Sequence, residues 1–346
     1  MIRMRVLVLV ALFATWAAYA PRSIAQSMIP LEGHNDCVNS VAFSPNGRFL
    51  ASGSGKFVGL LQKPRPGEAI VWLDVGKSSP RVVLDGHKDG VSCVTFSPDG
   101  ATLATASFDC TVNLWDVAKW RKIATILHYA GAVLSVAFSP DGSVLATGGW
   151  GGNGKDSVHE AKLWDTRTHA LITTLRGHTS GIMSVAFSPD GRRLATGSMD
   201  GTAKVWNIAR REAETTLQMP EEQWGNSVTF SPDGSLLATG SGLGGAKKPG
   251  KITLWRCDGW KLAATLDGEG EIVYCVAFSP DGKTLASCGD DGLISLWDVD
   301  RRTKERTLKG HDGARINAIT FSPDGKHLAS GGSDDIIGLW ELHSND

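Results

Sequence analysis

Histidine, serine and aspartate, the residue types of a nucleophilic triad, occur together twice in this chain at the same spacing. The first set is His87, Ser107 and Asp109, with Trp115 six residues beyond the aspartate. The second set has the same types in the same order, at His178, Ser198, Asp200 and Trp206. A nucleophile would need one exposed copy, so a set that recurs in full favours a structural element over a catalytic one.

A glycine-rich segment, GWGGNGKD from Gly149 to Asp156, resembles a phosphate-binding loop because Lys155 follows Gly154. It has Asp156 where a serine or threonine would bind magnesium, and it lies between two predicted strands rather than before a helix. The chain also has no HExxH sequence and no GxSxG sequence followed by a helix. These observations predict that the protein is not an enzyme, with no catalytic residue, cofactor or metal site.

An internal repeat sets the positions of all these residues. The sequence FSP recurs seven times, beginning at Phe43, Phe96, Phe138, Phe187, Phe230, Phe278 and Phe321. Successive copies are 42 to 53 residues apart. Self-similarity at this period indicates a repeat architecture.

The stretch from Gly177 to Leu194, GHTSGIMSVAFSPDGRRL, opens one such repeat. Residues Ile182 to Phe187 are apolar or small at nearly every position, which is typical of a strand covered on both faces. SPDG then predicts a tight turn, LATGS a second strand, MDGT a second turn and AKVWN a third strand, with a weaker fourth strand over Ala213 to Leu217. Seven such units, stacked radially, cover one another's faces. The sequence therefore predicts an all-β seven-bladed β-propeller of four-stranded antiparallel blades over residues 26–346.

Two further motifs carry a family resemblance. Gly-His precedes the first strand at Gly33-His34, Gly86-His87, Gly177-His178 and Gly310-His311. A tryptophan ends the third strand in every repeat, at Trp72, Trp115, Trp164, Trp206, Trp255, Trp297 and Trp340. With aspartate after three of these tryptophans, the chain resembles the WD-repeat family over residues 28–342. A periplasmic propeller of the Tol type also uses a PDG turn, but the Gly-His and Leu-Trp-Asp elements fit it poorly.

The resemblance implies that each His-Ser-Asp-Trp set is a buried, hydrogen-bonded tetrad inside one blade. A buried indole N–H, imidazole and carboxylate need such partners. The full set is expected only in blades 2 and 4, because glycine replaces the serine at Gly289 and Gly332. The expected histidine is absent in blades 3, 5 and 6, which we predict to be less rigid; its place is taken by Tyr129, Glu221 and Glu269.

The two ends of the repeated region complement each other. The chain ends soon after a third strand, IIGLWEL, whereas MIPLEGH near the start reads like the fourth-strand endings TTLRGH and RTLKGH. We expect Met28 to Leu31 to complete the last blade, and the resemblance implies a ring closed by the mature N-terminal strand.

The six cysteines form no CxxC pair for a metal or haem. Cys93 and Cys275 both lie three residues before their repeat's phenylalanine, in repeats that are not adjacent. Cys37 lies six residues before Phe43, and so at a different height. This register indicates buried free thiols rather than a dense disulfide framework.

Residues 1–25 are predicted to be a secretory signal peptide. Arg3 and Arg5 precede an apolar run over residues 6–20, and Ser23-Ile24-Ala25 offers small residues to a signal peptidase. An uncleaved anchor is the alternative, although the run is short for a membrane span. Without this segment the chain has 32 basic and 36 acidic residues, a formal charge of −4. We therefore expect a periplasmic or extracellular protein that binds no nucleic acid and, after cleavage, inserts in no membrane.

The connection between the second and third strands is enlarged in alternate blades. From the second-strand alanine to the third-strand tryptophan there are 11 residues in blades 2, 4, 6 and 7, but 21, 18 and 17 in blades 1, 3 and 5. Loops that grow on one face of a rigid ring commonly bind partners, although long, tolerated turns are the alternative. The candidate partner-binding residues, from these loops and from the short turns of blades 2 and 4, are Phe57, Lys63, Arg65, Phe108, Trp150, Met199, Lys247 and Lys248. Trp120 and Trp260, five residues after their blade's tryptophan, would give a second patch on the opposite face.

Two functional hypotheses follow. The first is a non-catalytic scaffold, a monomeric ring that holds a protein or peptide on the face with the enlarged loops. The second is a small-ligand binder or enzyme with its site at the mouth of the central channel. The groups available for that site are His159, Glu160, Glu221 and Glu222.

Overall fold

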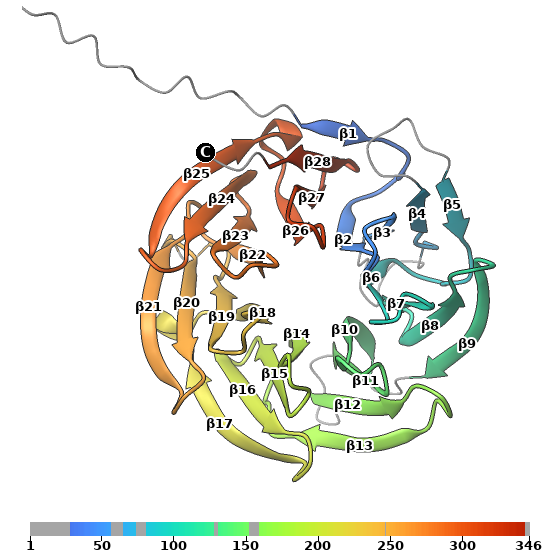
Figure 1. Ribbon diagram of the computed structural model, residues 1–346, viewed down its shortest axis with the longest axis horizontal. Helices are drawn as coiled ribbons and strands as arrows, with labels where there is room; N and C mark the ends of the chain where they lie inside the picture. Colours follow the sequence, from blue (N-terminus) through green and yellow to red (C-terminus); the bar gives the residue numbers. More distant parts are fainter. Residues whose placement is uncertain are drawn as a thin grey trace, which may run out of the picture.

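The structure is a computed structural model that describes residues 28–56, 65–73, 81–127, 131–151, 159–245 and 247–342. The predicted signal peptide, residues 1–25, and Tyr129 lie outside these ranges. Seven four-stranded antiparallel sheets stand in a ring (Figure 1). Within these ranges the only helices are two single 3-10 turns, η1 (Pro220–Glu222) and η2 (His311–Gly313). None of the helices in the described ranges has the length and apolar character needed to cross a membrane. The predicted seven-bladed β-propeller is confirmed.

Blades 1 to 4 are each formed by four consecutive strands, which lie in sequence order from the inside of the ring outward (Figure 1). Blade 1 contains β2 (Val38–Phe43), β3 (Phe49–Ser54), β4 (Ala69–Leu73) and β5 (Arg81–Leu84). Blade 2 contains β6 (Val91–Phe96), β7 (Thr102–Ser107), β8 (Thr111–Asp116) and β9 (Arg121–Leu127). Blade 3 contains β10 (Ala132–Phe138), β11 (Val144–Trp150), β12 (Glu160–Asp165) and β13 (Leu171–Arg176). Blade 4 contains β14 (Ile182–Phe187), β15 (Arg193–Ser198), β16 (Thr202–Asn207) and β17 (Glu212–Gln218).

The last three blades include one that combines the two ends of the described chain. Blade 5 contains β18 (Gly225–Phe230), β19 (Leu236–Ser241), β20 (Lys251–Arg256) and β21 (Lys261–Asp267). Blade 6 contains β22 (Val273–Phe278), β23 (Thr284–Gly289), β24 (Leu293–Asp298) and β25 (Thr303–Lys309). Blade 7 contains β26 (Ile316–Phe321), β27 (His327–Gly332), β28 (Ile337–Glu341) and, outermost, β1 (Ile29–Leu31). β1 pairs with β28 in antiparallel register, with Ile29 opposite Leu339 and Leu31 opposite Ile337.

The hydrophobic core is divided among the joints between blades. Each of the seven buried clusters contains residues of two neighbouring blades. At the joint between blades 5 and 6, for example, Leu254 of β20 packs in one cluster with Val273 and Trp297 of blade 6. A four-stranded sheet leaves both faces uncovered, so each blade obtains its core from its neighbours.

Polar bonds cross the same joints near the centre of the ring. A serine three residues before the repeat phenylalanine accepts a backbone N–H from the next blade at four of the joints. Ser227, for example, accepts from the N–H of Val276 at 3.1 Å. At two other joints a cysteine at this position donates to a carbonyl, Cys93 to Val136 and Cys275 to Ile319, at 3.8 and 3.7 Å. The joints therefore combine apolar packing with directional bonds.

A hydrogen-bonded tetrad lies inside blade 2, but one member differs from the prediction. Trp115 Nε1 donates to Thr105 Oγ1 at 2.9 Å, and that hydroxyl lies 2.8 Å from His87 Nε2. His87 Nδ1 lies 3.0 Å from an Asp109 carboxylate oxygen. The bridging hydroxyl thus belongs to Thr105 rather than to Ser107. Blade 4 has the same chain through Trp206, Thr196, His178 and Asp200.

Ser107 and Ser198 lie one level above the tetrads, at the ends of β7 and β15. Ser107 pairs in register with Val91, whereas Thr105 lies in the middle of its strand. The Ser107 hydroxyl donates to the Gly90 carbonyl at 2.9 Å and accepts the Asp109 N–H at 3.0 Å. Ser198 likewise donates to the Ser180 carbonyl at 3.1 Å. These serines close the loop above the tetrad and do not contact the tryptophan.

Blade 7 also has a complete tetrad, in which Ser330 takes the place of Thr105. Trp340 Nε1 donates to Ser330 Oγ at 2.9 Å, and that hydroxyl lies 2.8 Å from His311 Nε2. His311 Nδ1 lies 2.9 Å from Asp334. Gly332 occupies the position above and does not interrupt the chain, so the restriction to blades 2 and 4 is wrong. In the other four blades a tryptophan donates to the matching hydroxyl of Ser52, Thr147, Thr239 or Ser287.

Blade 1 has the histidine without the aspartate. His34 Nε2 lies 2.6 Å from Ser52 Oγ, but the buried Nδ1 has no hydrogen-bond partner within the described ranges. The nearest carboxylate oxygen, on Glu68, is 3.9 Å away. Burial, and then the positive charge of Arg81, lower the pKa of His34 to about 4. His34 is therefore neutral in the folded protein at pH 7.

The bridging role of threonine can be tested in blade 4. Replacing Thr196 with valine keeps the side-chain shape but leaves Trp206 Nε1 and His178 Nε2 without their shared partner. Because an unpaired buried polar group costs about 1–3 kcal/mol, we expect the free energy of unfolding to fall by more than about 2 kcal/mol. The matched variant, Ser198→Ala, should cost about 1 kcal/mol. Urea denaturation measures both, and equal losses would return Ser198 to the tetrad.

The uncharged state of His34 predicts a dependence of stability on pH. Its pKa falls from 6.5 to about 4 on folding. As the pH is lowered, the imidazole of His34 is therefore protonated in the unfolded chain before it is protonated in the folded chain. The free energy of unfolding should therefore decrease as the pH falls from about 6.5 to 4, by roughly 3 kcal/mol from this group. His34→Asn should flatten that decrease in urea denaturations across this pH range. His169→Asn, in the turn between β12 and β13, is the control, and a slope unchanged by His34→Asn would contradict the assignment.

Candidate functional site

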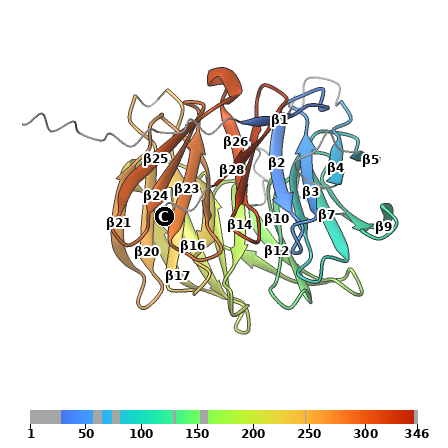
Figure 2. The same cartoon turned by 45° about the horizontal axis from the view of Figure 1, so that its top comes forward.

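The two faces of the ring carry different connections. Because the strands run from one face to the other, the second-to-third strand connections and the segments between blades share one side, which we call the loop face (Figure 2). The first-to-second and third-to-fourth strand turns share the other side, the turn face. The enlarged connections of blades 1, 3 and 5 therefore all belong to the loop face.

The enlarged connection of blade 1 is held by blade 2. Gly67 donates its N–H to the Asp89 carbonyl at 3.1 Å. A Cβ atom on Gly55 or on Gly67 would lie only 2.5 Å from the Gly90 Cα, so the backbones of the two blades are in direct contact. Arg65 is exposed just before this contact. Two other predicted residues of this loop, Phe57 and Lys63, lie outside the described ranges.

An aromatic side chain makes the corresponding contact from blade 3 to blade 4. Trp150, at the end of β11, packs against Gly181, where a Cβ atom would come within 3.0 Å of the indole. Gly181 also accepts the N–H of Met199 at 2.9 Å, so two predicted residues meet at this glycine. Phe108 covers Gly90 in the same way within blade 2.

The enlarged connection of blade 5 is anchored on both sides. Gly242 forms an isolated bridge with Ile272 of the segment before blade 6, and Gly245 donates its N–H to Glu271 at 2.7 Å. Lys248 forms a 3.0 Å ion pair with Glu221 of η1. Lys247 lies at the exposed tip with a positive φ of 54°.

In the described residues, the three enlarged connections are attached to the ring in the same way. Each belongs to an odd-numbered blade, and each has its base fixed to the segment that precedes the next blade. The glycines at these contacts permit the close backbone approach.

Trp224 is a loop-face residue that the sequence analysis missed. Its side chain is 38% exposed, and its carbonyl accepts the N–H of Gly242. It lies six residues before Phe230, a position at which blades 2 and 4 have Gly90 and Gly181. The signal that could have revealed Trp224 is a large aromatic residue at a position where two other repeats have glycine. It was missed because only the lengths of the second-to-third strand connections were compared.

On the turn face, Trp120 and Trp260 contact the preceding blades. Trp120 packs edge-on against Phe49 of blade 1, with ring centroids 5.2 Å apart. Trp260 lies under the Arg193 guanidinium and donates to Glu214 at 3.2 Å, both in blade 4. Both tryptophans therefore pack between neighbouring blades. A third-to-fourth strand turn is close enough to the preceding blade for its side chain to make this contact.

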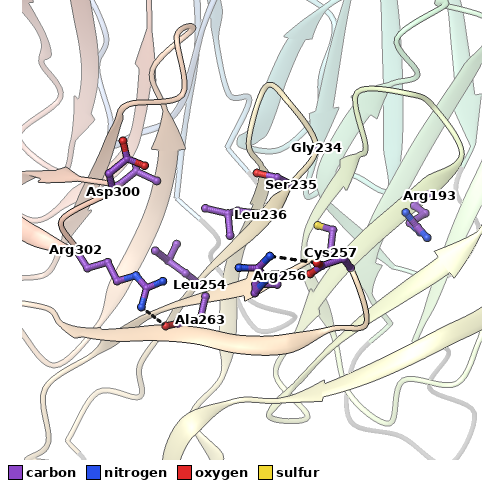
Figure 3. Close-up of a pocket in the computed structure, with 12 residues that line it drawn as sticks. Arg193, Gly234, Ser235, Leu236, Leu254, Arg256, Cys257, Ala263, Asp300 and Arg302 are labelled. Atoms are coloured by element: carbon purple, nitrogen blue, oxygen red, sulfur yellow. Dashed lines mark hydrogen bonds and ion pairs between the residues drawn. The ribbon is translucent and has the colours of Figure 1, made fainter.

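A depression of about 610 Å³ opens on the turn face beside blades 5 and 6 (Figure 3). Arg193, Arg256 and Arg302 line it together with Leu236 and Leu254. The protein's own groups already hold these arginines: Arg193 pairs with Glu214, Arg256 pairs with Asp258, and Arg302 donates to the Ala263 carbonyl. We assign no ligand to this depression.

The groups suggested for a channel-mouth site are not brought together. Glu160 lies on β12, where it accepts from Arg176 at 2.6 Å, and His159 directly precedes it. Glu221 belongs to η1, two blades away. The described residues therefore give no cluster of histidine and carboxylates in support of that hypothesis.

A family comparison accounts for the whole ring. The family model described as "WD domain, G-beta repeat" matches seven segments that together cover more than half of the chain. The matched residues are 25–59, 78–116, 120–155, 169–207, 226–255, 260–298 and 302–341. The chain belongs to the WD40 repeat family.

Similarity to individual WD40 proteins is partial. The chain is 36% identical over 113 residues to a chromatin assembly factor 1 subunit of Mus musculus, which is 30% of this chain and 20% of that protein. It is 41% identical over 78 residues to the beta-2 subunit of a guanine nucleotide-binding protein of Caenorhabditis elegans, 22% of this chain and 18% of that protein. It is 32% identical over 92 residues to a ribosome biogenesis protein WDR12 homolog of Drosophila persimilis, 25% of this chain and 22% of that protein. The chain spans about a fifth of the length of these curated relatives.

One group of possible metal ligands lies at the joint between blades 7 and 1 of this WD40 propeller. Ligand atoms of Asp36, Cys37 and Asp335 lie within 4.8 Å of one another. The Lys56 ammonium group, 3.2 Å from Asp36, already supplies a positive charge there. Acidic groups near a lysine are common on protein surfaces, and we assign no metal to them.

Proposed function

We propose that this WD40 propeller is a non-catalytic scaffold that holds a protein or peptide partner on its loop face. The observation that carries the proposal is the anchoring of three enlarged connections, in alternate blades, to the blade that follows each one. A loop that is fixed at its base loses less conformational entropy when a partner binds. The fixed bases of three such loops lie on one face of the ring.

The composition of the loop face supports the same proposal. Trp224 is partly exposed beside the enlarged connection of blade 5, and Lys247 and Arg65 are exposed on two of the loops. Tryptophan and arginine are enriched among the residues that contribute most to protein interfaces. Two of the relatives are named as subunits, which fits a role in assemblies. The formal charge of −4 after signal removal gives no support for nucleic acid as the partner.

The loop-face proposal predicts the effect of two substitutions in blade 5. Trp224→Ser combined with Lys247→Glu removes an aromatic anchor and reverses a charge without touching an inter-blade cluster. We expect this variant to bind a partner captured from an envelope extract at least tenfold more weakly, a difference of about 1.4 kcal/mol. Quantitative mass spectrometry of the captured proteins, followed by a binding titration with the identified partner, measures it.

The matched control replaces an exposed apolar residue elsewhere in the same blade. Leu262, on the outer strand β21, is 58% exposed, and Leu262→Ser should leave the partner's affinity unchanged. If both variants bind the partner as the original protein does, the loop face of blade 5 is not the site. If the original protein captures nothing, the channel-mouth hypothesis takes precedence, and melting-temperature shifts with metal ions and sugars would test it.

We further propose that the protein is exported and acts outside the cytoplasm as a monomeric ring. The apolar run after Arg3 and Arg5 and the small residues at Ser23 and Ala25 support export. All seven joints are made within one chain, so no second copy is needed to cover a blade.

Export predicts the first residue of the mature protein. N-terminal sequencing of material from the periplasm or the medium should begin at Gln26, directly after Ala25. An intact Met1 on protein that remains with the membrane fraction would favour the uncleaved anchor instead.

A further inference from the structure

Blade 6 contains two cysteines that face each other across neighbouring strands. Cys275 of β22 and Cys288 of β23 are partners in the antiparallel register. Both side chains lie on the side of the blade that faces blade 7. Cys288 is in the cluster with Ile316 and Ile319, and Cys275 packs against that cluster and donates to the Ile319 carbonyl at 3.7 Å.

No other blade has cysteine at both of these paired positions. The matching pairs are Ser40–Gly53, Cys93–Ala106, Ser135–Gly148, Ser184–Gly197, Ser227–Gly240 and Ala318–Gly331. At several of the glycines an added Cβ atom would lie closer than 3.0 Å to a β-branched side chain of the next blade. Cys288 therefore has a side chain at a position where five of the other blades have glycine, next to the following blade.

We propose that Cys275 and Cys288 form an intrachain disulfide that links the two inner strands of blade 6. Directly paired residues of an antiparallel sheet have Cα atoms about 4.5–5.5 Å apart, which is within the range that a disulfide spans. Forming the bond draws the two sulfurs to about 2 Å, closer than two thiols can pack. This disulfide would form within the chain whether or not the proposed partner binds.

The two thiols have different chemical characters. A hydrogen bond from Cys288 lowers the pKa of Cys275, whereas burial and then the neighbouring Cys275 raise the pKa of Cys288 well above its ordinary value. Cys275 is also only partly buried, whereas Cys288 is 4% exposed. Because its pKa is the lower of the two, we expect Cys275 to be the first of these thiols to react.

The reaction is a thiol–disulfide exchange with a small disulfide such as oxidised glutathione. The Cys275 thiolate attacks one sulfur of that disulfide, forms a mixed disulfide and releases one glutathione thiolate. The Cys288 thiolate then attacks the Cys275 sulfur, forms the intrachain bond and releases the second glutathione thiolate. The two protein thiols supply the two protons, and the small disulfide takes up the two electrons.

The test uses the folded, full chain after complete reduction. The protein is treated with oxidised glutathione, alkylated, denatured and analysed by thiol titration and peptide mapping. The chain has six cysteines, and we expect six thiols before treatment, four after it, and one cross-linked peptide pair that contains Cys275 and Cys288. The urea midpoint of the oxidised protein should also rise, because the bond restricts the unfolded chain.

Two variants make the result specific. Cys288→Ala introduces the residue that blade 2 has at Ala106, so it should fold, and it should hold glutathione on Cys275 without forming a cross-link. Cys93→Ser changes the matching thiol of blade 2 and should leave the Cys275–Cys288 cross-link unchanged. Six free thiols after treatment, or a cross-link between other cysteines, would overturn the proposal, as would glutathione that remains on Cys275 of the original protein.

Discussion

The structure depends on the burial of each blade's faces against its two neighbours. All seven hydrophobic clusters straddle a joint between blades, and none is contained in one sheet. A blade therefore has no core of its own, and its stability is largely a property of two interfaces. The internal tetrads have a different task. Their tryptophan–hydroxyl bond, which all seven blades have, ties the third strand to the second strand, so that each blade meets its neighbours with a fixed shape.

The sequence was sufficient to predict the parts of the fold that repetition makes visible. The number of strands, the turns and the seven blades could be predicted from three recurring motifs: FSP, SPDG and the third-strand tryptophan. Each motif occupies the same place in the backbone of every blade. The identity of the bridging hydroxyl was less visible. Thr105 and Ser107 are both polar residues of one strand, and only the register shows that Ser107 is level with the loop while Thr105 is level with His87 and Trp115.

The candidate site was only partly predictable, for a related reason. The lengths of the connections identified three unusual loops, but length carries no information on what a loop contacts. That Trp150 packs on Gly181, and that Gly67 contacts Gly90, depends on pairs of residues from different repeats. Trp224 escaped notice because its segment has ordinary length. Contacts between repeats are set by the geometry of the ring, which a comparison of repeats with one another does not contain.

The same geometry explains why the loops could enlarge where they did. An insertion within a strand or an inner turn would displace one of the joints on which two blades depend. The second-to-third strand connections lie beyond the buried clusters, so added residues there leave the core intact. In blades 1 and 5 the described parts of the connections bond to the segment before the following blade, as Gly67 does to Asp89 and Gly245 to Glu271, and in blade 3 Trp150 packs on Gly181. The described bases of the enlarged connections therefore extend the joints between blades outward.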